Sequence, residues 1–184
     1  MIVGVVLAGG TSARFGGEPK GLMPFRGRAM ALLVADVLAQ VCERVVVEAA
    51  RGVGYEALGL PVIHAASVHA GKGPLAGIVA GLSAAPDQSR VVFAPCDMPL
   101  INAEIFRTLL NAPASAYAIS PSGTEPLVAV LERAMLAPLL ATLAADKIPR
   151  TDAALEAAGA RGVAFADATP FANVNTPGDL ARLE

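Results

Sequence analysis

Short apolar runs without polar alternation constrain the fold most. Ile2–Leu7, Arg44–Val47 and Arg90–Ala94 are such runs, and they are typical of strands buried on both faces of a parallel sheet. Between them, Ala29–Val41 separates apolar from polar residues at spacings of three and four, which predicts a helix. Pro74 opens a second predicted helix that continues to Ala84. This alternation predicts an α/β fold with a mostly parallel sheet.

The second half of the chain adds helices and one antiparallel feature. Asn102 is a predicted N-cap for a helix that ends at Leu110, and Thr176-Pro177 begins the last helix. A turn connects two β-like runs, Tyr117–Ser120 and Pro126–Leu131, so we expect a small antiparallel excursion from the parallel core. The alanine-rich region Met135–Ala160 is expected to be helical.

Composition narrows the class of protein. The 184 residues contain no repeat or linker, so residues 1–184 are expected to form a single domain. No apolar run approaches the ~18 residues of a membrane span, and no basic segment precedes the first run, so a cytoplasmic protein is expected. The net charge of −2 and the pI of about 5.7 argue against a nucleic-acid partner. Cys42 and Cys96 are expected to be reduced.

The loop after the first predicted strand is suited to phosphate. It carries two glycine pairs, Gly9-Gly10 and Gly16-Gly17, followed by Lys20, with Arg14 between the pairs. Glycines let backbone N–H groups approach an anion closely, and the two cations neutralise charge. A surface loop with two solvated cations is the alternative. In parallel sheets ligands bind beyond the carboxyl ends of the strands, which is where this loop lies.

Two other glycine patterns carry no nucleotide site. Gly71-Lys72-Gly73 lacks the hydroxyl residue that follows the lysine in a Walker A loop. The segment Gly52–Ala57 matches a dinucleotide fingerprint, but Gly59 and Pro61 leave room for barely one helical turn. We therefore expect no nicotinamide or flavin site.

A second candidate follows the run Arg90–Ala94. Asp97 lies in a turn stiffened by Pro95 and Pro99, and it is the only acid between Asp87 and Glu104. Mg²⁺ typically takes one or two carboxylates together with phosphate oxygens and water. Asp97 is therefore a candidate Mg²⁺ ligand, and a helix or turn cap is the alternative.

Four motifs occur along the chain: Leu7–Leu22, Gly73–Gly77, Pro95–Pro99 and Phe171–Pro177. In order and spacing they resemble a known family, the molybdenum cofactor guanylyltransferases, and the resemblance covers nearly the whole chain. The first and third motifs are shared by many nucleotidyltransferases of this fold, and the others are more specific to the molybdenum cofactor branch.

The resemblance implies a three-layer, Rossmann-like nucleotidyltransferase domain and a reaction of GTP with the molybdenum-loaded molybdopterin cofactor. It implies that GTP contacts come from the N-terminal loop and Lys20, that Asp97 holds Mg²⁺, and that Gly73–Gly77 helps to select guanine. It also implies an acceptor-facing or site-completing role for Asn173 and Asn175. The candidate binding residues are Leu7, Ala8, Gly9, Gly10, Lys20, Glu48, Gly73, Pro74, Leu75, Gly77, Asn173 and Asn175.

Four positions depart from the family pattern. Glu48 stands where the family usually has Asn, Ala65 and Pro19 where it has Asp, and Glu125 where it has His. Guanine presents two adjacent donors that one carboxylate can accept, so Glu48 is a candidate replacement for the missing Asp at position 65. The alternative is a solvated acid at a strand end.

The expected chemistry is an in-line attack of an acceptor phosphate on the α-phosphate, with pyrophosphate leaving. Arg14, Lys20 and Asp97 are the candidate catalytic residues, Asn175 is a candidate second metal contact, and Arg150 is a candidate contact for the acceptor phosphate. Cytidylyl transfer to the same cofactor, nucleotidyl transfer to another phosphorylated small molecule, and a non-catalytic nucleotide-binding role are the alternatives. Molybdoenzymes or cofactor-delivery proteins are candidate partners, whereas nucleic acid and membranes are not.

Overall fold

The computed structural model describes residues 1–9 and 19–183. Two candidate site residues, Gly10 and Arg14, lie outside the described residues. In the described part of the chain, no helix has the length and apolar character that a membrane crossing requires.

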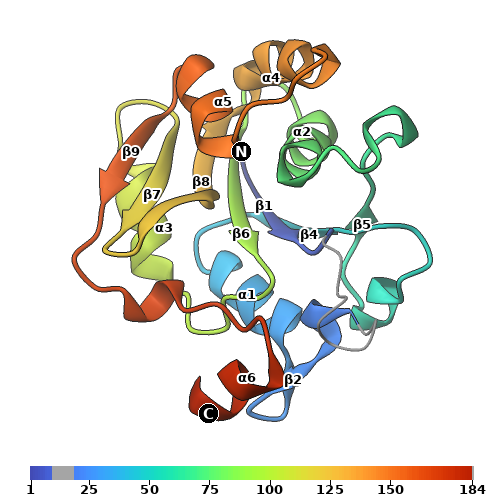
Figure 1. Cartoon of the computed structure of the whole chain (residues 1–184), viewed down its shortest axis with the longest axis vertical. Coiled ribbons are helices and arrows are strands. Elements are labelled where there is room, and N and C mark those ends of the chain that lie inside the picture. The colour runs from blue at the N-terminus through green and yellow to red at the C-terminus, as the bar shows by residue number, and fades with distance from the viewer. Residues whose placement is uncertain (10–18, 184) are drawn as a thin grey trace.

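A seven-stranded sheet in the order β5-β4-β1-β6-β8-β7-β9 forms the centre of the molecule (Figure 1). Every neighbouring pair is parallel except the two pairs that contain β8. The expected mostly parallel sheet with one antiparallel excursion is therefore confirmed. The strands are β1 (Ile2–Leu7), β4 (Arg44–Glu48), β5 (Val62–Ile63), β6 (Arg90–Pro95), β7 (Ala116–Ser120), β8 (Gly123–Glu132) and β9 (Arg161–Ala164).

Helices cover both faces of the sheet, which gives three layers (Figure 1). The alternation along β1 shows why: Val5 belongs to the apolar cluster that includes residues of α2, α4 and α5, whereas Val6 belongs to the cluster that includes residues of α1 and α3 on the opposite face. A strand that is buried on both faces needs no polar positions, which explains the uninterrupted apolar runs. The helices are α1 (Met30–Leu38), α2 (Pro74–Ala84), α3 (Ala103–Leu110), α4 (Leu136–Ala144), α5 (Thr151–Ala157) and α6 (Pro177–Leu183).

Several element boundaries differ from the expectation. The region Met135–Ala160 is not one helix: α4 and α5 are separated by residues 145–150, because Pro149 cannot continue a helical ladder. The helix expected over Ala29–Val41 is shorter, with Ala29 as its N-cap.

The runs expected from the sequence also do not include four short strands, of which β5 is one. The short strand β9 pairs in parallel with β7, but its glycine lowers its β signal. A two-residue hairpin joins β2 (Pro24–Phe25) to β3 (Arg28–Ala29) through Arg26 and Gly27, both at positive φ.

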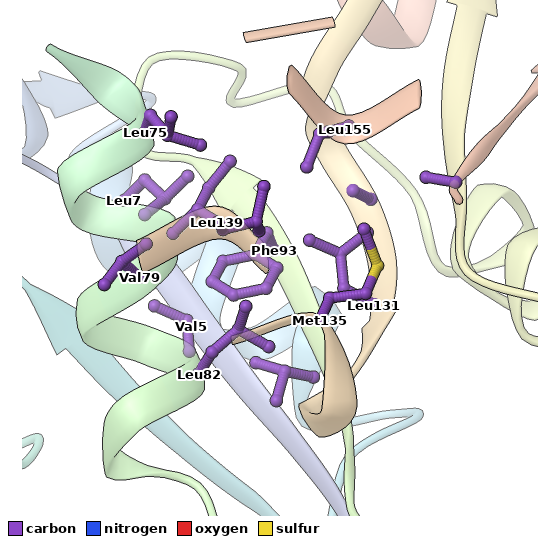
Figure 2. Packing of buried hydrophobic residues seen from close by; sticks show 14 of the residues in the cluster. Val5, Leu7, Leu75, Val79, Leu82, Phe93, Leu131, Met135, Leu139 and Leu155 are labelled. Carbon is purple, nitrogen blue, oxygen red and sulfur yellow. The ribbon is translucent and has the colours of Figure 1, made fainter. Parts of the chain in front are cut away.

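The core between the sheet and helix α2 is close-packed around Phe93. Its ring lies among Val5, Leu82 and Leu131 (Figure 2), and Phe93 is fully buried. Gly81 of α2 allows this approach, because a Cβ there would lie 2.5 Å from the Phe93 ring. The helix and the centre of the sheet are therefore held at a distance that Phe93 and Gly81 set together.

We expect Phe93→Ala to lower the free energy of unfolding by about 3–5 kcal/mol, because it removes a fully buried ring and leaves a cavity. Urea denaturation followed by circular dichroism measures the change. Val68→Ala is the control, since Val68 is 70% exposed, and we expect a change within about 0.5 kcal/mol. Equal effects of the two substitutions would contradict this account of the core.

Candidate active site

The candidate site is built on the carboxyl ends of β4, β1 and β6. The registers place Leu7 level with Glu48 on one side and with Pro95 on the other. Two backbone hydrogen bonds extend this alignment to the ends of the strands. The Ala8 N–H donates to the Glu48 carbonyl at 2.8 Å, and the Cys96 N–H donates to the Leu7 carbonyl at 3.0 Å. The loops after these three strands therefore start at one edge of the sheet.

Lys20 joins three segments that are far apart in sequence. Its ammonium Nζ donates to Asn175 Oδ1 at 2.7 Å and lies 3.4 Å from Asp97 Oδ2. The side chains of Lys20 and Asp97 are each 20% exposed, so the ion pair is largely withdrawn from solvent and open on one side. The structure thus brings together three of the candidate residues.

A buried tyrosine supports the start of the segment that carries Lys20. The Tyr55 hydroxyl accepts a hydrogen bond from the Gly21 N–H at 3.1 Å, and Tyr55 is 1% exposed. The Tyr55 side chain is also hydrogen-bonded to the Cys96 thiol. Burial of this thiol raises the pKa of Cys96 to about 12. Cys96 is therefore a packed, protonated thiol, as expected. The 3₁₀ turn Tyr55–Leu58 is the single short turn expected before Gly59 and Pro61, so no long helix follows the glycines of this segment.

Asn175 is fixed by the cap of α6. Thr176 is the N-cap, and its Oγ1 accepts from the Asp179 N–H at 3.1 Å. Asp179 Oδ2 in turn accepts from the Asn175 N–H at 3.1 Å and from the Thr176 hydroxyl at 2.9 Å, so the first turn of α6 holds the backbone of Asn175 in place. The Val174 N–H donates to the Asp97 carbonyl at 2.8 Å, which attaches this segment to the turn of Asp97. Asn173 lies on the same segment and is half-buried.

Glu48 is a buried acid between two glycines. It is 5% exposed, and a Cβ on Gly9 or Gly77 would lie 2.7 or 2.8 Å from its Oε2. Burial raises the pKa of Glu48, while backbone N–H groups of Ala65 and Gly9 and the nearby His64 act in the opposite direction. The solvated strand-end acid considered as an alternative does not describe this residue.

The segment Gly73–Gly77 is the first turn of α2. Gly73 has φ 71°, and Pro74 occupies the first helical position. Leu75 is 1% exposed and packs near Leu7 (Figure 2), so both leucine side chains belong to the core. What these residues present to the site is backbone rather than side chain.

The oxygen atoms at the site are of the type that binds hard cations. Asp97 offers a carboxylate and Asn175 an amide oxygen, which suit Mg²⁺ with phosphate oxygens completing the shell. Among the described residues there is no group of three or more His, Cys, Asp or Glu side chains arranged for a metal. Arg150, the candidate contact for the acceptor phosphate, is exposed and forms an ion pair with Asp152 at 2.9 Å.

This architecture defines a Rossmann-like nucleotidyltransferase. Residues 4–164 match the MobA-like NTP transferase domain. The chain belongs to this family, and it is a nucleotidyltransferase.

Curated and solved relatives agree with this assignment. The molybdenum cofactor guanylyltransferase of Yersinia pestis (strain Pestoides F) is 37% identical over 188 aligned residues, which cover 97% of this chain and 92% of that protein. Molybdopterin-guanine dinucleotide biosynthesis protein A from Archaeoglobus fulgidus has the same fold, with a TM-score of 0.79 at 24% identity over 100% and 97% of the two chains.

The fold alone does not determine which nucleotide base an enzyme of this kind recognises. A 4-diphosphocytidyl-2C-methyl-D-erythritol synthase from Anaerococcus prevotii shares the fold with a TM-score of 0.73 at 13% identity, over 100% of this chain and 94% of that chain. Base selection must therefore be argued from the residues at the site.

The buried Glu48 gives a pH dependence of stability. Its folded-state pKa is raised from the usual 4.5, so the folded protein binds this proton more tightly than the unfolded chain does. The carboxylate therefore destabilises the fold increasingly as the pH rises from about 4.5 through the raised pKa. Relative to Glu48→Gln, the wild type should lose free energy of unfolding across this window. Urea denaturation at a series of pH values measures the difference, and a constant difference would contradict the assignment.

Proposed function

We propose that this enzyme transfers GMP from GTP to the molybdenum-molybdopterin cofactor, forming the guanine dinucleotide cofactor and releasing pyrophosphate. The convergence of Lys20, Asp97 and Asn175 at the carboxyl edge of the sheet carries this proposal. The relatives' named activity supports the choice of substrates.

The triphosphate is proposed to lie along the N-terminal loop. Ala8 and Gly9 continue β1 toward Lys20, and Gly9 has no side chain to obstruct an approaching phosphate. Arg14 is proposed to add a second cation to the same loop. Leu7, whose side chain is buried, contributes through its backbone.

The guanine base is proposed to lie over Glu48 and the first turn of α2. Both Gly9 and Gly77 approach the Glu48 carboxylate, so the acid lies where the phosphate loop meets α2. A carboxylate can accept from N1–H and the 2-amino group of guanine, and the Gly73–Gly77 backbone offers N–H and C=O groups beside it. The burial of Glu48 strengthens each such bond, because water competes less for the acid.

The acceptor phosphate attacks the α-phosphorus in line, and the bond to the β-phosphate oxygen breaks as pyrophosphate leaves. The acceptor oxygen is already anionic, so no general base has to remove a proton. Lys20 offsets negative charge in the transition state, and Asn173 and Asn175 orient the acceptor side.

A divalent cation, proposed to be Mg²⁺, fits the oxygen donors of Asp97 and Asn175. When bound, such an ion neutralises charge on the phosphates. The Lys20 ammonium contacts both residues, with its Nζ 2.7 Å from Asn175 Oδ1 and 3.4 Å from Asp97 Oδ2.

The decisive experiment is a transfer assay with GTP, Mg²⁺ and molybdenum-loaded molybdopterin, followed by detection of pyrophosphate and the dinucleotide. Asp97→Ala should abolish transfer, since the proposed metal ligand is gone, while the melting temperature stays within a few degrees. EDTA should abolish wild-type transfer in the same assay. Normal transfer by Asp97→Ala would remove the metal assignment.

Lys20→Ala should slow turnover by a factor on the order of 10²–10³, the usual loss for a group that stabilises transition-state charge. Steady-state kinetics with saturating GTP measures it. Lys147→Ala is the control, because Lys147 lies in the segment between α4 and α5. A loss below threefold for Lys20→Ala would show that this lysine is a bystander.

GTP should be preferred over CTP, ATP and UTP. The physical reason is that a base that leaves the buried Glu48 and α2 backbone groups unpaired loses ~1–3 kcal/mol per group. The test is to measure the rise in melting temperature that each of the four triphosphates causes in wild type and in Glu48→Ala. If Glu48→Ala keeps the wild-type preference, selectivity belongs to the Gly73–Gly77 backbone. If wild type prefers CTP, the guanylyl proposal is replaced by cytidylyl transfer.

A further inference from the structure

The Tyr55 hydroxyl contacts the peptide group next to Lys20. Lys20 opens the 3₁₀ turn Lys20–Leu22, and Pro19 precedes this turn without a polar side chain that could cap it. The first N–H groups of a helical turn have no partner inside the turn. The Gly21 N–H is one of them, and it donates to the Tyr55 hydroxyl at 3.1 Å. Tyr55 therefore fixes the peptide plane between Lys20 and Gly21.

The packing around Gly21 leaves this turn little room to move. Gly21 is buried, and a Cβ at this position would lie 2.7 Å from the Tyr55 hydroxyl oxygen and 3.1 Å from the Cβ of Ala31 in α1. Non-bonded carbon atoms pack best at about 3.5–4.0 Å, so a glycine is needed for so close an approach. The turn that carries Lys20 is thus packed against both Tyr55 and helix α1.

Tyr55 is itself fixed by the core. It is 1% exposed and belongs to the apolar cluster that includes Val6 of β1 and Val47 of β4. Its side chain is also hydrogen-bonded to the thiol of Cys96, which follows β6 and precedes Asp97. Side chains in a close-packed core keep one arrangement. The Tyr55 hydroxyl therefore has a fixed position relative to the ends of these strands.

One hydroxyl thus contacts the sequence neighbours of both members of an ion pair. Gly21 follows Lys20, Cys96 precedes Asp97, and Lys20 Nζ lies 3.4 Å from Asp97 Oδ2. A lysine side chain is long and has many rotamers, so a fixed backbone narrows the positions that its ammonium group can reach. Position matters at a reacting centre, because an error of about 1 Å can slow a reaction by about 10²-fold.

We propose that Tyr55 is a positioning residue that holds the Lys20 ammonium at Asp97 through the hydrogen bond from the Gly21 N–H to the Tyr55 hydroxyl. The inference rests on the proposed function, because it concerns the lysine that offsets charge in that reaction. Tyr55 is buried and acts through Lys20 rather than on the substrate.

A double-mutant cycle tests the inference. Tyr55→Phe removes the hydroxyl and keeps the ring, so kcat with saturating GTP should fall by on the order of 10-fold. The KM for GTP should change by less than about threefold, because the lost interaction acts in the transition state. In the Lys20→Ala background, Tyr55→Phe should cause no further loss of kcat, because both substitutions act through one ammonium group.

Tyr117→Phe is the matched control for this cycle. Tyr117 is also 1% exposed, and its hydroxyl donates to Glu156, so the substitution removes a comparable buried hydrogen bond elsewhere in the fold. Its kcat should equal that of wild type. A loss of kcat in Tyr117→Phe as large as that in Tyr55→Phe would show a general effect of hydroxyl removal and would overturn the inference.

Hydrogen exchange of the Gly21 amide tests the contact itself, without turnover. It is followed by NMR of the isotope-labelled full-length protein. Tyr55→Phe should speed this exchange by on the order of 10-fold, because the amide loses its acceptor. Tyr117→Phe should leave the rate unchanged. An unchanged Gly21 rate in Tyr55→Phe overturns the inference, whether or not the enzyme transfers GMP.

Lys20→Ala separates failure of the inference from failure of the proposed function. A large loss of kcat in Lys20→Ala with wild-type kcat in Tyr55→Phe overturns the role of Tyr55 and leaves the proposed function standing. Losses that multiply in the double variant show that Tyr55 acts independently of Lys20, which also overturns the inference. Wild-type kcat in Lys20→Ala removes the proposed role of this lysine, and the inference with it.

If Tyr55→Phe does not fold, Gly21→Ala decides, because its Cβ displaces the turn from the Tyr55 hydroxyl. A lowered kcat in Gly21→Ala, with no further loss when it is added to Lys20→Ala, supports the inference. An unchanged kcat in Gly21→Ala overturns it.

Discussion

The position of β1 between two parallel neighbours is the constraint on which the site depends. Its ladders to β4 and β6 fix Leu7, Glu48 and Pro95 at one level of the sheet. A slip of one residue in either ladder would turn every side chain of β1 to the opposite face and exchange the two cores. The apolar residues on both faces of β1 therefore secure the alignment of the loops that contain the candidate catalytic groups.

The burial of Glu48 shows how the site depends on the same alignment. An acid that is 5% exposed destabilises the fold unless polar groups surround it, and the N–H groups of Gly9 and Ala65 are placed to do so. These donors come from the loop after β1 and the segment after β5. The acid consequently stabilises the position of both segments, whatever it contributes to base recognition.

The sequence was sufficient for the parallel core, the β7–β8 excursion and the caps at Asn102 and Thr176, because each depends on local patterns of few residues. It was insufficient for the break between α4 and α5, which lies in an alanine-rich region, and for β9, whose glycine lowers the β signal. In the site, Asp97 and Lys20 were visible as a lone acid and a loop cation. Tyr55 was not assigned a role, since it supports Gly21 from 34 residues further along the chain.

The antiparallel direction of β8 also makes the two ends of this sheet edge different. On the side of β5, the chain leaves this edge and returns to β6 through α2, which packs into the core. On the side of β8, a tight hairpin between Ser120 and Gly123 borders the edge, and residues 121–124 are exposed. Residues added to or removed from such a hairpin leave both core layers intact. A change in the length of this hairpin would therefore alter one border of the candidate site, while the ladders of β1 keep the rest of that edge in place.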